Sequence, residues 1–188
     1  EVNKDTLLID LNDARERVTN KTKVILPVLY ASNPDDLEKT YALADEFNLR
    51  VIEDSAHAFG CNYNGKKIGA QGDIICFSFD GIKNITSGEG GAIFTSDVKV
   101  MEYVKDARLL GVEKDSEMRY KGKRSWDFDV SVQGYRYHMS NIFAAIGRVQ
   151  LRRFEKEFAI SRKNIAKKYS RLLKNNKHVN RRTQGYER

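Results

Sequence analysis

Short apolar runs and segments with apolar residues at helical spacing follow one another along the chain, and they predict strands and helices in succession. Four mostly apolar runs predict strands at 23–30 (KVILPVLY), 50–54 (RVIED), 73–79 (DIICFSF) and 92–95 (AIFT). The first run is typical of a strand that is covered on both faces. Helical spacing predicts helices at 10–18, 34–48 and 98–110, and a long helical segment from about 140 to 175. Asn33 and Pro34 supply an N-cap and a first helical residue for the second of these helices.

The order of these elements predicts an α/β fold. Strands that alternate with helices pair in parallel through right-handed crossovers, so we expect a mainly parallel sheet flanked by helices, with a long C-terminal helical segment. The connections inside 55–92 are too short for helices, and this part is expected to be irregular or hairpin-like. The polar stretch 111–133 has no clear period.

Length and composition narrow the class of protein. The chain has 188 residues, of which 40% are apolar, and this suits a single domain with a real core. Its longest apolar run, 24–30, is far shorter than the roughly 20 residues of a membrane span. Cys61 and Cys76 make no disulfide framework and have no metal-ligand spacing around them. We therefore expect a cytoplasmic protein with no membrane contact and no metal.

Charge is distributed unevenly. Residues 1–100 carry a net charge of −5 and residues 101–188 a net charge of +12. A basic C-terminal part suits either nucleic acid or an anionic ligand. In 152–172 the basic residues interleave with apolar ones at near-helical spacing, which favours a solvated outer helix face instead. Nucleic acid is therefore the less favoured partner.

Three polar side chains lie at the ends of predicted strands or just beyond them. Asp54 ends the strand at 50–54, Ser78 lies near the end of the strand at 73–79, and Lys83 lies in the glycine-flanked loop beyond. In parallel sheets ligands collect at the carboxyl ends of strands, so these three groups could meet on one small molecule. Each also has an ordinary structural explanation: a turn cap for Asp54, a small core residue for Ser78 and a solvated amine for Lys83.

Three segments, taken in order, resemble a known family. VIEDSAHAFG, FSFDGIKNITSGEGGAIFTSD and GYRYHMSNIFAAIGRVQL resemble the DegT/DnrJ/StrS-type nucleotide-sugar aminotransferases, which are fold-type I pyridoxal-phosphate enzymes, and the likeness spans residues 5–172. The resemblance implies the large domain of that fold and pyridoxal 5'-phosphate as cofactor. It implies transfer of an amino group, with glutamate as donor, to a nucleotide-linked keto sugar in surface polysaccharide or deoxysugar biosynthesis.

The resemblance also implies roles for individual residues. Lys83 matches the lysine that forms the Schiff base, and Asp54 matches the carboxylate that pairs with the pyridine nitrogen. His57 matches a position near the phenolic oxygen of the cofactor, and Ala56 would pack beneath the ring. Ser78 matches a hydroxyl that binds the cofactor phosphate.

One departure from the family pattern concerns the neighbouring subunit. The family reads Gly-Tyr-Asn-Tyr-Arg-Met where this chain has GYRYHM at 134–139, so Arg136 replaces an asparagine that reaches the partner's cofactor phosphate in a homodimer. Arg136 could still do so with its longer, charged side chain. By the same resemblance the phosphate-binding turn is expected upstream of Glu1 and a small domain beyond the C-terminus. We expect a cofactor-binding core at 1–138, a helical segment at 139–175 and an unassigned tail at 176–188.

Three alternatives stay open at this point. A related sugar dehydratase uses the same cofactor with His in place of the lysine, and Lys83 argues against it. A regulatory or nucleic-acid-binding protein would use the basic segment, and an inactive relative would keep the fold without the chemistry.

Overall fold

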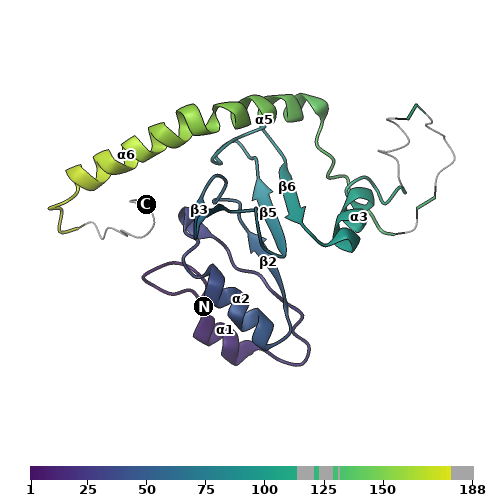
Figure 1. Cartoon of the computed structure of the whole chain (residues 1–188), viewed down its shortest axis with the longest axis horizontal. Coiled ribbons are helices and arrows are strands. Elements are labelled where there is room, and N and C mark those ends of the chain that lie inside the picture. Colours follow the sequence, from purple (N-terminus) through teal and green to yellow (C-terminus); the bar gives the residue numbers. More distant parts are fainter. Residues whose placement is uncertain (114–120, 123–128, 131, 179–188) are drawn as a thin grey trace.

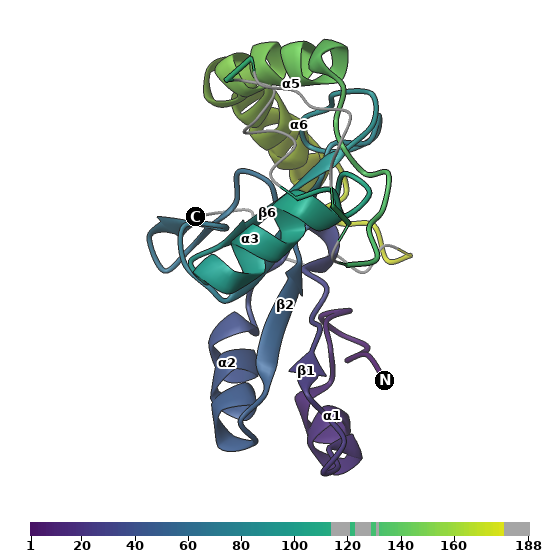
Figure 2. The same cartoon turned by 90° about the vertical axis from the view of Figure 1, so that its right-hand side faces the viewer.

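The computed structural model describes residues 1–113, 121–122, 129–130, 132–178, and the predicted polar stretch 111–133 lies partly outside them. Its elements in chain order are α1 (Leu11–Arg17), β1 (Val24–Ile25), the 3-10 turn η1 (Tyr30–Ser32), α2 (Leu37–Glu46), β2 (Arg50–Asp54), β3 (Asn62–Tyr63), β4 (Lys66–Lys67), β5 (Ile74–Ser78), β6 (Gly91–Thr95), α3 (Val98–Ala107), α5 (Asn141–Arg153), the π-helical turn η2 (Phe154–Phe158) and α6 (Ala159–Leu172). Helices α1 and α2 lie at one end of the molecule and the long helix α5–α6 at the other (Figures 1 and 2).

The main sheet has the strand order β1-β2-β5-β6. β1, β2 and β5 are parallel, as predicted, and α2 forms the crossover between β1 and β2. β6 is antiparallel to β5, because the connecting loop returns directly without a helix. β3 and β4 form a separate two-stranded hairpin between β2 and β5, which confirms the expected hairpin-like region. The strands β2 and β5 point with their carboxyl ends toward the long helix (Figure 1).

The first strand is shorter and less covered than its sequence predicts. Only two residues form β1, and Pro27 offers no N–H to a neighbouring strand, although its carbonyl oxygen still accepts from the Asp54 amide at 2.9 Å. Ile25 is buried, but Leu26 and Val28 on either side of Pro27 are 54% and 41% exposed. The prediction of a strand covered on both faces is therefore wrong for this run.

One face of the sheet carries the core. Ile25 and Val51 pack there against Leu43 and Ala44 of α2. α2 begins at Leu37 rather than at Pro34, because the Asn33 side chain accepts from the Asp35 amide at 3.1 Å in a separate turn. The opposite face of β2 and β5 carries Asp54 and Ser78, both of which are half-buried.

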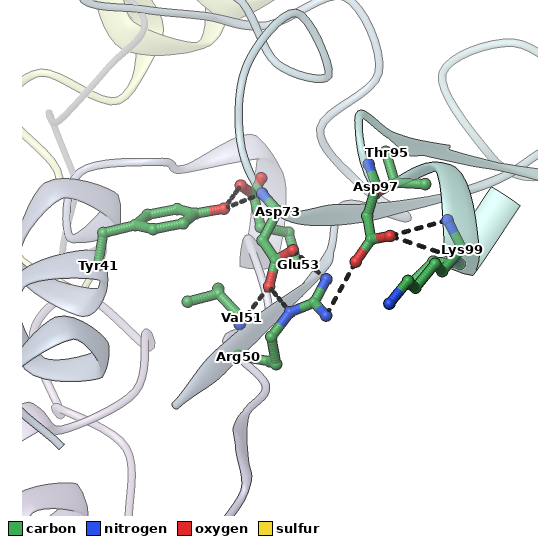
Figure 3. A network of polar contacts seen from close by, with 9 residues as sticks. Tyr41, Arg50, Val51, Glu53, Asp73, Thr95, Asp97 and Lys99 are labelled. Carbon is green, nitrogen blue, oxygen red and sulfur yellow. Dashed lines mark hydrogen bonds and ion pairs between the residues drawn. The ribbon is translucent and has the colours of Figure 1, made fainter. Parts of the chain in front are cut away.

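A polar network ties the amino-terminal ends of β2 and β5 to the start of α3 (Figure 3). The Arg50 guanidinium donates twice to the Asp73 carboxylate, at 2.7 and 2.5 Å, and lies 3.2 Å from a carboxylate oxygen of Asp97. Asp73 also accepts from the Val51 amide at 3.0 Å, and Asp97 caps α3 by accepting from the Lys99 amide at 2.9 Å. This arrangement fixes the strand ends that lie away from Asp54 and Ser78.

A second network joins the same region to α2. The Tyr41 hydroxyl donates to Glu53 at 2.7 Å and accepts from the Asp73 amide at 2.8 Å (Figure 3). Burial raises the pKa of Glu53, and the hydrogen bond from Tyr41 partly opposes that rise.

A buried aromatic side chain of the long C-terminal helix packs against the segment that follows β2. α5, η2 and α6 follow one another without a break, as the predicted helical segment requires. Phe154, the first residue of η2, is buried and packs edge-on against Phe59 with ring centroids 5.4 Å apart. Beyond Phe154, Ile165, Tyr169 and Leu172 of α6 are 51–65% exposed, so the predicted inner face of α6 is not covered. The basic residues of α6 are exposed, as expected.

The contact between Phe154 and Gly60 predicts a steric test of this packing. A Cβ at Gly60 would lie 2.1 Å from two carbon atoms of the Phe154 ring, and the Gly60 φ of +82° already disfavours a side chain. We expect Gly60→Ala to lower the free energy of unfolding by about 2–4 kcal/mol. The Gly65→Ala control has a similar φ of +78° and nothing within 4 Å, so it should cost only the backbone part, about 1 kcal/mol. Urea unfolding followed by circular dichroism measures both, and equal losses would contradict this packing.

Asp73 and Glu53, both drawn in Figure 3, predict pH dependences of opposite sign. Hydrogen bonds from Arg50 lower the pKa of Asp73, so its carboxylate stabilises the fold above the usual Asp pKa of about 4 and loses this contribution as the pH falls. We expect Asp73→Asn to flatten the acid side of a stability-versus-pH curve. Glu53→Gln should instead remove a loss of stability that sets in as the pH rises above about 4.5, because burial raises that pKa. If both substitutions change the slope of the free energy of unfolding against pH in the same direction, these assignments are wrong.

Candidate active site

Asp54 and Ser78 end two neighbouring parallel strands on the same face of the sheet. Asp54 is paired in register with Cys76, and Ser78 follows Cys76 by two residues, so the alternation of side chains brings all three to one face. One carboxylate oxygen of Asp54 accepts from the Ala56 amide at 3.1 Å, which leaves the other oxygen outside this turn. The strand ends thus carry a carboxylate and a hydroxyl on adjacent strands, as the sequence predicts.

His57 lies in the turn that follows Asp54 and is held by the segment after β1. The Ala31 amide donates to Nδ1 of His57 at 3.4 Å, and the Ser32 hydroxyl donates to the His57 carbonyl oxygen. Ala31 and Ser32 have φ values of 51° and 67°, in the left-handed region that residues with a side chain rarely adopt. Since Nδ1 accepts a hydrogen bond, a neutral His57 carries its proton on Nε2.

Lys83 is half-buried in the loop between β5 and β6. Its amide donates to the Asp80 carbonyl at 3.1 Å, which closes a tight turn. Lys83 shares a cavity of about 230 Å³ with His57 and with Ala31, Ser32, Ile82 and Asn84. The structure therefore brings the amine and the imidazole predicted from the sequence to one hollow.

The remaining predicted site residues lie elsewhere. Of the described residues that line this cavity, none is Asp54, Ala56 or Ser78. Arg136 is exposed on the segment between α3 and α5, where it forms an isolated bridge with Leu109. The proposed roles of these residues thus stay predictions.

Sequence reasoning missed three residues that shape this site. Asn84 joins the lysine loop to the His57 turn, with its amide nitrogen 3.1 Å from the His57 carbonyl oxygen. Ala31 and Ser32 line the cavity from a segment more than 50 residues before Lys83. Their left-handed backbone has no signal in the sequence, because neither residue is a glycine or an asparagine. Asn84, as the direct neighbour of Lys83, was the one position that could have been singled out.

The donor set fits a small anionic aldehyde with a ring nitrogen. An amine, a carboxylate, a hydroxyl and an imidazole are the groups that pyridoxal phosphate needs for its aldehyde, ring nitrogen, phosphate and phenolic oxygen.

Burial raises the pKa of Cys76, and the Asp54 carboxylate raises it further, so this thiol is not an activated nucleophile. Among the described residues, no group of three or more His, Cys, Asp or Glu side chains is arranged to hold a metal.

Comparison with known proteins identifies the family. The model of the DegT/DnrJ/EryC1/StrS aminotransferase family matches residues 1–187. This chain belongs to that family. It is 39% identical, over 175 residues, to the uncharacterized protein MJ1066 of Methanocaldococcus jannaschii, a match that covers 93% of this chain and 45% of that protein.

Solved structures of aminotransferases share the fold. PseC of Helicobacter pylori, an aminotransferase involved in the biosynthesis of pseudoaminic acid, is 30% identical with a TM-score of 0.83, over 94% of this chain and 45% of PseC. The PLP-form of Spr1654 from Streptococcus pneumoniae, a putative sugar aminotransferase, is 26% identical with a TM-score of 0.79, over 93% of this chain and 47% of that one. This chain thus spans about half the length of these relatives. No described helix is long and apolar enough to cross a membrane.

Proposed function

We propose that this chain forms the cofactor-binding part of a pyridoxal-phosphate-dependent sugar aminotransferase. The observation that carries the proposal is the cavity shared by Lys83 and His57, in a member of an aminotransferase family. His57 lies in the turn directly after the strand end at Asp54, and Ser78 lies on the neighbouring parallel strand. Bound pyridoxal phosphate supplies an aldehyde that captures an amine and a ring that draws electrons from the neighbouring carbon.

Lys83 is proposed to hold the aldehyde carbon and to move the proton. An amine attacks a carbonyl carbon as a nucleophile, and Lys83 is the lysine that lines the cavity. Once a second amine has displaced it, the same nitrogen can accept a proton from the substrate carbon and return it to the cofactor carbon.

The other site residues are proposed to orient the ring. Asp54 has one oxygen outside its turn that can accept from a protonated ring nitrogen, which favours electron withdrawal as charge develops. Nε2–H of His57 would donate toward the phenolic oxygen, Ala56 would pack beneath the ring and the Ser78 hydroxyl would donate to the phosphate.

Arg136 is proposed to contact the cofactor of a neighbouring subunit. Arg136 is exposed and free to reach outward, which is compatible with a phosphate contact in the partner of a homodimer. We further propose a nucleotide-linked keto sugar as acceptor and glutamate as donor, in polysaccharide or deoxysugar biosynthesis. The exposed basic residues of α6 suit a diphosphate-bearing substrate.

The first test asks which lysine captures pyridoxal phosphate. After borohydride reduction, we expect the peptide that contains Lys83 to carry the pyridoxyl group at least about tenfold more than peptides with exposed lysines such as Lys105. Lys83→Ala should abolish this preference, and Lys105→Ala should leave it unchanged. Peptide mass spectrometry measures the ratio, and uniform labelling of all lysines would sink the proposal.

The second test separates cofactor capture from chemistry. Asp54→Asn keeps an oxygen for the Ala56 amide but loses the charge that pairs with a protonated ring nitrogen. We expect the Lys83 preference to persist while single-turnover transfer from glutamate slows by about 10²-fold or more. Transfer at a rate close to that of the unsubstituted protein would rule out the proposed role of Asp54.

A further inference from the structure

Asn84 ties the lysine loop to the turn that carries His57. Its side-chain nitrogen Nδ2 donates to the carbonyl oxygen of Phe59 at 2.9 Å and to that of His57 at 3.1 Å. A side-chain amide has two N–H donors, so both are used. The partners lie 25 and 27 residues away along the chain, and the Asn84 side chain is half-buried between the two segments.

The same junction is held from two further sides. The Ser32 hydroxyl donates to the same His57 carbonyl oxygen, which fills the second acceptor position of that oxygen. From α6, the exposed Arg162 guanidinium approaches the carbonyl oxygens of Lys83 and Asn84 at 3.4 and 3.5 Å. These last two contacts are long, so Asn84 makes the tighter connection.

A fixed main chain matters for a lysine because its side chain has a long flexible stem. The His57 turn follows Asp54 directly, and the Asp54 carboxylate is bound inside that turn by the Ala56 amide. A residue that joins the lysine loop to this turn therefore restrains the main chain at Lys83 relative to the turn that follows Asp54.

We propose that Asn84 is a positioning residue that holds Lys83 in register with the His57 turn and with Asp54. This rests on the proposed function, in which Lys83 and Asp54 act on the same ring. A displacement of about 1 Å in such a constellation costs about 10²-fold in reactivity.

The test replaces the donor without changing its shape. Asn84→Asp keeps the size of the side chain but turns its two donors into an acceptor that faces two carbonyl oxygens. We expect the preference of pyridoxal phosphate for Lys83 over Lys105, measured after borohydride reduction, to fall at least about tenfold. Amide hydrogen exchange in residues 79–90 should speed up by at least about tenfold, while exchange in α3 stays unchanged.

A matched control makes the same chemical change where an acceptor is wanted. The Asn33 side-chain oxygen accepts from the Asp35 amide at 3.1 Å, and a carboxylate can do the same. Asn33→Asp should therefore leave the Lys83 preference and the exchange in 79–90 within about twofold of the unsubstituted chain. An Asn84→Asp chain that keeps both values would overturn the inference.

A measurement without substitution covers the case in which Asn84→Asp does not fold. In the unsubstituted chain, the side-chain amide protons of Asn84 should exchange with water at least about tenfold more slowly than those of Asn33, by nuclear magnetic resonance. Equal exchange would refute the connection. If the unsubstituted chain shows no preference for Lys83, the proposed function fails, and the two exchange measurements still decide whether Asn84 holds the loop.

Discussion

The parallel pairing of β2 with β5 decides where the polar groups of this chain lie. Ile52, Glu53 and Asp54 are aligned with Ile74, Ile75 and Cys76. A shift of one residue in this register would move Asp54 to the face that carries the core and bring Glu53 out of it. The bidentate contact between Arg50 and Asp73 lies just before the aligned residues and opposes such a shift. The candidate site thus depends on a network at the other end of the same strands.

Much of the fold follows from local pattern. β2, β5 and β6 have the compact apolar runs that predict strands, and α1, α3 and the long C-terminal helix have clear helical spacing. The errors arise where context overrides pattern. The run at 23–30 is mostly apolar, yet Pro27 limits its pairing and Leu26 is half-exposed. Asn33 and Pro34 carry the composition of a helix start but form a preceding turn, and the helix begins at Leu37.

The sequence predicts residue types for the candidate site, but it does not predict the contacts that hold these residues in place. Lys83 and His57 share a cavity, as their family resemblance implies, although they are far apart in the sequence. Asp54 and Ser78 lie on one face of the sheet because β2 and β5 are parallel neighbours in this register. What holds these residues is long-range: the Asn84 amide reaches carbonyl oxygens 25 and 27 residues away, and Ser32 reaches the same turn. Such contacts depend on loop conformation, which local periodicity does not describe.

The π-helical turn at Phe154–Phe158 sets the phase between the two halves of the long helix. A π turn holds about one residue more than an α turn, so each residue beyond it is rotated by about 100° relative to an uninterrupted helix. Phe154 at its start packs against Phe59, and Arg162, eight residues later, approaches the carbonyl oxygen of Lys83. Without the widened turn, the two side chains would face different directions around the helix axis. The π-helical turn therefore allows one continuous helix to contact Phe59 through Phe154 and the lysine loop through Arg162.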